Sequence, residues 1–310
     1  MNKKIVFMGT PNFAVPILKN IFQNGFEISA VYTQPPKKSD RGQKITKSPI
    51  HILAETLNLE VRTPEKLKDN KEEYEYLKKI GVSLGVVVAY GQILTKDILN
   101  LSKNGFINLH ASVLPLNRGA SPIQRSIMNL DKETGISVMK INEKLDAGDV
   151  SDIFEIDILE NENTQSLNER LSILAAEKIS DVIDNIFDGS TTYKEQDHRN
   201  ATYAKKIDKA EGKINWNDNA LQILGKVNGL FPVPGAFFNF NGERYKVLKA
   251  EIGSGIGKVG EVLSDKLEIA CKNNQSIKVI EIQRQGKKSQ KIGEFMLGSQ
   301  IKKGSVILNV

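Results

Sequence analysis

The opening of the chain constrains the fold most strongly, because it alternates a strand, a helix and a second strand. Residues 4–8 form a short apolar run that ends at a glycine, and Pro11 suits the first turn of the helix that follows. Residues 28–33 form a second apolar run. Two strands joined by a helix pair in parallel, so this opening predicts an α/β fold with a parallel sheet. Residues 82–89 are almost uninterruptedly apolar, as expected of a central strand in such a sheet.

The turn after the first strand limits what this sheet can bind. It reads Gly9-Thr10-Pro11 and lacks the Gly-x-Gly-x-x-Gly pattern that lets a backbone approach a pyrophosphate. The sequence therefore predicts a Rossmann-like sheet that does not bind a dinucleotide.

A chain of 310 residues is long for one hydrophobic core, and its pattern changes near residue 189. Residues 164–187 carry apolar side chains at helical spacing, which predicts a long helix against the sheet. The next stretch is rich in turn formers, and beyond it short apolar strands alternate with Gly, Asn and Asp turns. We therefore predict an α/β domain at 1–188, a linker at 189–208 and a small β-barrel at 209–310.

Composition indicates a cytoplasmic protein without membrane contact. No apolar run approaches the roughly 18 residues of a membrane span. The apolar run at the N-terminus is broken at Gly9 and Pro11, too early for a signal peptide. The single cysteine, Cys271, cannot form an internal disulfide or a thiolate pair for a metal. No other cluster of metal-ligating residues stands out, so no metal is expected.

Three polar side chains in the middle of the chain are candidates for a site. Residues 106–112 alternate apolar and polar residues, which places Asn108 and His110 on one face of a strand. This strand ends where a proline forces a loop, and the carboxyl end of a strand in an α/β sheet lies beside the usual ligand crevice. Asp146 lies in an acidic turn, residues 145–149. Taken singly, each residue has an ordinary explanation as a strand partner, a turn partner or a buried polar group.

Their joint spacing is more specific. The chain reads Asn-x-His-x-Ser-x-Leu-Pro-x-x-Arg-Gly from Asn108, and Leu-Asp-x-Gly-Asp from Leu145. This pattern resembles the signature of the folate-dependent formyltransferases. Shorter matches occur at residues 9–11, 33–35, 87–91 and 201–204. The resemblance therefore spans most of the chain.

The resemblance implies a fold, an activity and a site. The fold is a Rossmann-like formyltransferase domain followed by an OB-like β-barrel, and the formyl donor is 10-formyltetrahydrofolate. The resemblance assigns catalytic roles to Asn108, His110 and Asp146. It assigns folate binding to a loop of four residues, Ser112, Val113, Leu114 and Pro115. Arg118 is expected either to contact the folate tail or to brace this loop.

Formyl transfer to an amine is an acyl transfer that passes through a tetrahedral centre bearing an oxyanion. Such a step requires donors aimed at that oxygen and a base for the proton that the attacking amine loses. Asn108 can donate through its amide, and His110 can donate when it holds a proton. Asp146 is expected to orient the His110 ring.

A basic segment at residues 34–49 bears on the identity of the acceptor. It holds five cations against one acid, Asp40, and the cations are Lys37, Lys38, Arg41, Lys44 and Lys47. Prolines at both ends and an internal glycine predict an exposed loop, which in an arbitrary protein is an ordinary solvated surface. In formyltransferases that act on a tRNA, a basic insertion at this place holds the acceptor arm. The resemblance assigns tRNA binding to Lys37, Lys38, Arg41 and Lys44.

The distribution of charge agrees with a nucleic-acid partner. Residues 207–310 hold 16 Lys and Arg against 10 Asp and Glu, whereas residues 1–206 hold 27 against 27. A basic last third favours contact with a polyanion, although a chain rich in lysine throughout would also produce it. Together with these charges, the resemblance implies that the protein formylates the free amino group of initiator methionyl-tRNA for translation initiation. We expect it to act as a monomer.

Two other functions remain open from the sequence. A formyltransferase for a small amine, such as a nucleotide sugar or glycinamide ribonucleotide, needs no basic loop. A catalytically inactive tRNA-binding relative would lack one of the three catalytic residues, and all three are present. The chain also departs from the family pattern at Asp40, where glycine is more usual, and at Val233, where tryptophan is more usual.

Overall fold

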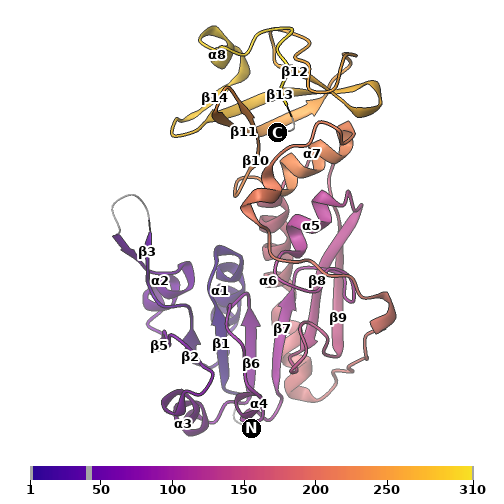
Figure 1. Cartoon of the computed structure of the whole chain (residues 1–310). Coiled ribbons are helices and arrows are strands. Elements are labelled where there is room, and N and C mark those ends of the chain that lie inside the picture. The colour runs from indigo at the N-terminus through magenta and orange to yellow at the C-terminus, as the bar shows by residue number, and fades with distance from the viewer. Residues whose placement is uncertain (1–2, 40–43, 309–310) are drawn as a thin grey trace. The chain divides into compact units, whose positions relative to one another are not determined.

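The computed structural model describes residues 3–39 and 44–308 (Figure 1). Its largest sheet has seven strands, in the order β5 (Val61–Arg62), β2 (Ile28–Tyr32), β1 (Ile5–Gly9), β6 (Leu84–Val88), β7 (Phe106–His110), β8 (Glu133–Lys140) and β9 (Val150–Asp157). The strands from β5 to β7 are parallel, and β8 is antiparallel to β7. The α/β class with a mainly parallel sheet is therefore confirmed.

Helices alternate with these strands along the chain or follow them. They are η1 (Asn12–Ala14), α1 (Val15–Gln23), α2 (Pro49–Thr56), α3 (Lys71–Ile80), α4 (Lys96–Leu99), α5 (Pro122–Met128), α6 (Thr164–Asp188) and η2 (His198–Asn200). The long helix predicted at 164–187 is α6. Two serines hold α6 to the start of the chain, since Ser172 Oγ donates to the carbonyl of Phe13 and Ser180 Oγ to Asn20 Oδ1.

Burial explains the sequence of the central strands. Every residue of β1 and β6 is buried, so both faces of these strands require apolar side chains. Gly85 of β6 makes room for a neighbour, because a Cβ at this position would lie 1.9 Å from Cδ1 of Phe106 on β7. The continuous apolar run and its one glycine thus follow from packing between adjacent strands.

The chain divides into two compact units that are not continuous in sequence. The first unit comprises Met1–Gly119, Gly135–Ile156 and Asn168–Tyr203. The second comprises Ala120–Thr134, Asp157–Leu167 and Ala204–Val310. Helix α5 therefore lies in the same unit as α7 (Ala220–Gly229).

Two glycines of α7 explain why α5 packs so closely against it. A Cβ at Gly225 would lie 2.8 Å from Cδ2 of Leu130, and one at Gly229 would lie 2.5 Å from Cγ of Met128. Side chains at these two positions would push the helices apart, so the glycines permit the close approach. This contact joins residues 120–134 to the C-terminal part of the chain.

The second unit contains an antiparallel sheet, in agreement with the predicted β-rich C-terminal part. Its remaining elements are η3 (Lys209–Gly212), β10 (Ala236–Phe240), β11 (Glu243–Ile252), β12 (Glu268–Cys271), η4 (Lys272–Asn274), β13 (Gln275–Arg284), β14 (Ser289–Lys291) and α8 (Ile292–Leu297). The strands are ordered β10-β11-β13-β12, with β14 also on β13.

Four aromatic rings pack together within the largely aliphatic core of this second unit. Phe238 lies in the middle, with its ring centroid 6.0 Å from that of Trp216 and 5.5 Å from that of Tyr245. Tyr245 in turn meets Phe295 edge to face at 5.7 Å. Such tilted and offset contacts are the arrangements that aromatic pairs prefer.

Among the helices of the described residues, none is long and apolar enough to span a membrane.

Candidate active site

Strand β7, which lies between β6 and β8 in the large sheet, carries the first two candidate residues. Asn108 lies opposite Met139 of β8, and His110 lies opposite Ser137. Their spacing of two places both side chains on one face, as the sequence predicted. His110 is buried at 6% exposure, whereas Asn108 is half-buried. The Asn108 amide makes no hydrogen bond within residues 3–39 and 44–308, so its donors are available to a ligand.

The His110 ring is fixed by partners on both sides. Its Nε2 lies 2.9 Å from the carbonyl oxygen of Asn117, and because a carbonyl only accepts, Nε2 is the donor. The other ring nitrogen, Nδ1, lies 3.8 Å from Oδ2 of Asp146. The structure therefore brings His110 and Asp146 together, and Nδ1 is the ring nitrogen that faces the carboxylate.

Asp146 lies in a tight turn, residues 145–149, which we call the Asp146 turn. Its backbone has a φ of 47°, a region that Asp adopts more easily than most residues. Its Oδ2 accepts a hydrogen bond of 2.8 Å from the amide of Gly119. Gly148 lets the turn close, because a Cβ there would lie 1.8 Å from the carbonyl oxygen of Lys140. The small residues around Asp146 thus serve to aim its carboxylate.

The predicted folate-binding residues lie in a loop after β7, residues 112–119, which we call the Pro115 loop. Ser137 on β8 holds its start: Ser137 Oγ donates to the carbonyl of Ser112 at 2.7 Å and accepts from the amide of Leu114 at 3.0 Å. The Leu114 side chain is buried, whereas Val113 and Pro115 are half-buried and offer apolar surface. The peptide bond between Leu114 and Pro115 is cis.

Arg118 braces the site from within. It is 3% exposed, and its Nε and Nη2 both donate to Oε1 of Gln196, at 3.1 and 2.7 Å. Its Nη2 also donates to Nδ1 of His198 at 2.9 Å. Of the two expectations for Arg118, these contacts agree with bracing the loop.

Gln196 is a residue of this site that the sequence did not indicate. Its Nε2 donates to the carbonyl oxygens of Asp146, at 3.0 Å, and Gly148, at 2.7 Å. It comes from the segment at 189–208, whose polar composition predicts a linker. The one sequence signal nearby is the family match at residues 201–204. In the structure Thr202 of that match accepts the amide of Asn117 on Oγ1 and the amide of Arg118 on its carbonyl.

The basic segment at 34–49 is not a simple loop. It contains a two-stranded antiparallel ribbon, β3 (Lys37–Ser39) and β4 (Lys44–Thr46), with Lys37 opposite Thr46 and Lys38 opposite Ile45. The prolines that predict a loop lie outside both strands, where they leave the backbone pairing intact. Lys37 is exposed, and Arg41 lies outside the described residues.

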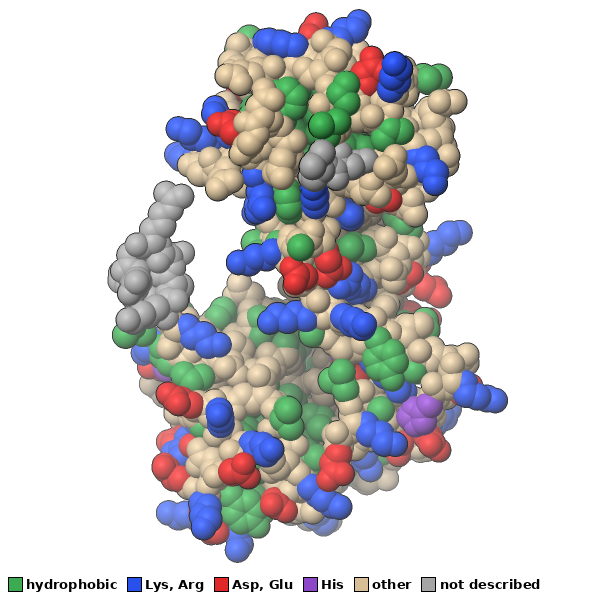
Figure 2. All heavy atoms as spheres, viewed as in Figure 1, with side chains coloured by type: hydrophobic (Ala, Val, Ile, Leu, Met, Phe, Trp, Pro, Cys, Tyr) green, Lys and Arg blue, Asp and Glu red, His purple; other side chains and the backbone are tan. Residues whose placement is uncertain are grey.

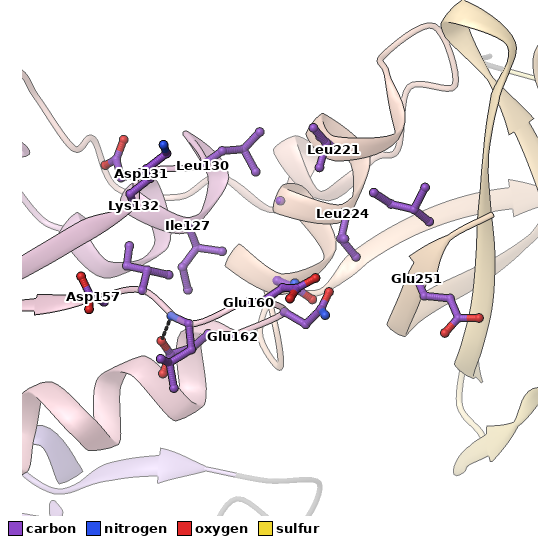
Figure 3. A pocket seen from close by; sticks show the side chains of 16 residues that line it. Ile127, Leu130, Asp131, Lys132, Asp157, Glu160, Glu162, Leu221, Leu224 and Glu251 are labelled. Carbon is purple, nitrogen blue, oxygen red and sulfur yellow. Dashed lines mark hydrogen bonds between the residues drawn. The ribbon is translucent and has the colours of Figure 1, made fainter. Parts of the chain in front are cut away.

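A cavity of about 630 Å³ lies in the second unit (Figure 3). Its lining combines apolar side chains, such as Ile127 and Leu224, with acidic ones, such as Glu160 and Glu251. None of the predicted site residues lines it. Across the part of the chain that the structure describes, no three His, Cys, Asp or Glu side chains gather as metal ligands.

Comparison with protein families assigns both parts of the chain to known family models. Residues 3–183 match the family described as formyl transferase, and residues 206–300 match the formyl transferase C-terminal domain. The chain therefore belongs to the formyl transferase family, which confirms the resemblance found in the sequence.

Two named relatives match this chain over almost its whole length. The chain is 64% identical over 310 residues to a methionyl-tRNA formyltransferase of Pelagibacter ubique, with 100% of both chains covered. It is 39% identical over 307 residues to a methionyl-tRNA formyltransferase of Caldanaerobacter subterraneus, covering 98% of this chain and 99% of the relative.

Solved structures share the fold. WlaRD, a sugar 3N-formyl transferase crystallised with dTDP and 5-N-formyl-THF, superposes with a TM-score of 0.69 at 21% identity. The match covers 93% of this chain and 100% of WlaRD. HypX from Aquifex aeolicus, in complex with tetrahydrofolic acid, gives a TM-score of 0.67 at 16% identity, covering 98% of this chain and 49% of HypX. At these identities the likeness shows the fold alone.

The double role of Ser137 predicts a loss of stability in Ser137→Ala. The side chain is fully buried, so its removal leaves the carbonyl of Ser112 and the amide of Leu114 without their partner. We expect the free energy of unfolding to fall by about 1–3 kcal/mol, measured by urea denaturation. Ser190→Ala is the matched control, because the Ser190 hydroxyl is bonded at the exposed end of α6. Equal stability of the two variants would contradict the bridging role.

Proposed function

We propose that the chain transfers a formyl group from 10-formyltetrahydrofolate to the free amino group of initiator methionyl-tRNA, for translation initiation in the cytoplasm. The observation that carries the proposal is the joint placement of Asn108, His110 and Asp146 in a chain that is 64% identical over its full length to a methionyl-tRNA formyltransferase. We propose that it acts as a monomer.

The proposed chemistry assigns one task to each residue. The amine attacks the formyl carbon and loses a proton, and the carbonyl oxygen becomes an oxyanion. The C=O bond then re-forms as the bond to the folate nitrogen breaks, and that nitrogen takes up a proton and leaves as tetrahydrofolate. The amide of Asn108, which no described residue bonds, is suited to donate to that oxyanion. His110 Nε2 is already bonded to Asn117, so Nδ1, beside Asp146, is the nitrogen that we assign to the proton lost by the amine.

The Pro115 loop is proposed to hold the folate. Its residues Ser112, Val113, Leu114 and Pro115 follow directly from the strand that carries Asn108 and His110. Backbone groups of such a loop can meet the polar edge of a pterin, and the half-buried Val113 and Pro115 offer an apolar wall.

We propose no metal for this reaction, because the donors and the base that formyl transfer requires are supplied by side chains of this site.

The C-terminal part is proposed to bind the tRNA together with the basic ribbon. We assign catalysis to residues 1–188, the connection to 189–208 and tRNA binding to 209–310. On the face shown in Figure 2, Lys and Arg side chains are spread over the β-rich part rather than gathered in one patch. Such a spread suits contacts along a phosphate backbone.

Other acceptors have less support. The sugar formyltransferase WlaRD shares the fold at 21% identity, far below the identity to the methionyl-tRNA formyltransferases. An inactive tRNA-binding relative would be expected to lose part of the catalytic set. Asn108, His110 and Asp146 are all present.

Substitution of the catalytic residues is expected to lower turnover strongly while tRNA binding persists. His110→Ala and Asp146→Asn should each lower kcat for formylation of methionyl-tRNA by about 100-fold or more, the range typical of a general base. Turnover is measured with radiolabelled methionyl-tRNA and 10-formyltetrahydrofolate, and tRNA binding by filter retention.

His51→Ala provides the matched control, because His51 is also a buried histidine beside a carboxylate, with Nε2 3.2 Å from Glu55 Oε1. It should leave kcat unchanged. A wild-type enzyme that leaves methionyl-tRNA unformylated would overturn the proposed function, and full turnover by the two site variants would overturn the residue assignment.

Neutralising the basic ribbon is expected to weaken tRNA binding without changing chemistry. The triple variant Lys37→Gln, Lys38→Gln, Lys44→Gln should raise KM for methionyl-tRNA and leave kcat unchanged. The slope of log affinity against log salt should become shallower by roughly 1 for each phosphate that the ribbon no longer neutralises. Binding is measured between low and physiological salt.

The control makes the same change in net charge elsewhere. Lys71, Lys78 and Lys79 are exposed lysines of α3, and their replacement by glutamine should leave KM unaltered. Equal effects of the two triple variants would mean that net charge alone attracts the tRNA. In that case the ribbon has no specific role.

A further inference from the structure

Gln196 connects the Asp146 turn to the Pro115 loop, the two segments that surround His110. Its amide nitrogen donates to the carbonyl oxygens of Asp146 and Gly148, and its amide oxygen accepts from Arg118. These contacts span 48 to 78 residues of sequence. A single side chain therefore ties three distant segments together.

The chemistry of these contacts requires a carboxamide. Both protons of Nε2 are committed to carbonyl oxygens, and Oε1 receives two N–H groups of one guanidinium. A carboxylate could accept from Arg118 but could not donate to the two carbonyls. A hydrophobic side chain of the same length could do neither, and Gln196 is 7% exposed, so water would not easily replace it.

One of the Gln196 hydrogen bonds holds the backbone of Asp146, the residue whose carboxylate lies beside His110. Asp146 holds a positive φ, a conformation that Asp tolerates better than most residues but that is still favoured by contacts holding its backbone. Gln196 bonds the carbonyl of this same residue, while Gly119 bonds its carboxylate. The Asp146 side chain is thereby held from both ends beside Nδ1 of His110.

We propose that Gln196 is a positioning residue for formyl transfer, which sets the place of the Asp146 carboxylate beside His110. This inference rests on the proposed catalytic role of Asp146. Gln196 acts through the backbone of Asp146 and Gly148, while Arg118 fixes its own amide.

Gln196→Glu separates this role from simple bracing of Arg118. The new carboxylate still accepts from Arg118, but it faces the carbonyl oxygens of Asp146 and Gly148 with no proton to donate, so the melting temperature should fall by only a few degrees. It cannot donate to the two carbonyls, so kcat should fall about 10- to 100-fold, with KM for both substrates little changed. Wild-type kcat in Gln196→Glu would overturn the proposal. If that variant fails to fold, Gln196→Met is measured instead, and wild-type kcat there is equally contradictory.

Asn70→Ala is the matched control. The Asn70 amide also bridges two backbone groups of the first unit, donating to the carbonyl of Lys66 at 3.1 Å and accepting from the amide of Glu73 at 3.2 Å. As the N-cap of α3 it should lower the melting temperature by a few degrees without lowering kcat. A similar loss of kcat in this control would mean that reduced stability alone explains the effect of Gln196.

A crystal structure of Gln196→Glu tests the same point without turnover. The Asp146 carboxylate is expected to move away from the Gly119 amide, and an unmoved carboxylate would overturn the proposal. Failure of the proposed function is recognised separately, because it appears as absence of formylation by the wild-type enzyme.

Discussion

The hydrogen bond from the Gly119 amide to the Asp146 carboxylate is the interaction on which the candidate site depends. It joins the end of the Pro115 loop to the Asp146 turn, and it leaves the same carboxylate oxygen 3.8 Å from Nδ1 of His110. The carbonyl of Asn117 holds the opposite edge of the imidazole ring. His110 therefore sits between two segments whose separation is fixed by one backbone amide, and a shift of either segment would change the distance from the ring to the carboxylate.

Backbone groups rather than charged pairs provide most of this support. Ser137 holds the Pro115 loop through the backbone of two residues, and Gln196 holds the Asp146 turn through two carbonyls. Arg118 is buried with a glutamine and a histidine as its partners. Such contacts are directional, so they favour one geometry of the site over its neighbours. This rigidity suits acyl transfer, where donors must already point to the place at which charge develops.

The parts of the fold with a local sequence signal could be predicted. The apolar runs of β1 and β6 and the helical spacing of α6 depend on burial of each element, and the alternation in β7 placed Asn108 and His110 on one face. Asp146 required the family pattern, since nothing local distinguishes it from an ordinary turn residue.

Features that depend on distant contacts could not be predicted. Gln196 stands in a polar stretch, and its partners lie 48 to 78 residues away. The packing of α5 on α7 depends on Gly225 and Gly229, which in sequence look like weak points of a helix. The ribbon of β3 and β4 could not be predicted because its lysines are typical of loops, and backbone pairing rather than a side-chain pattern defines it. The catalytic, folate and tRNA assignments themselves stay predictions.

Hydrogen exchange of the Gly119 amide tests the central claim most directly. The account predicts that this amide is protected about 100-fold or more in the wild-type protein, and that Asp146→Ala removes the protection while the amide of Phe7 in β1 keeps its own. Both amides can be followed by NMR of the labelled protein in deuterated buffer. An unprotected Gly119 amide in the wild type, or protection that survives Asp146→Ala, would contradict the account.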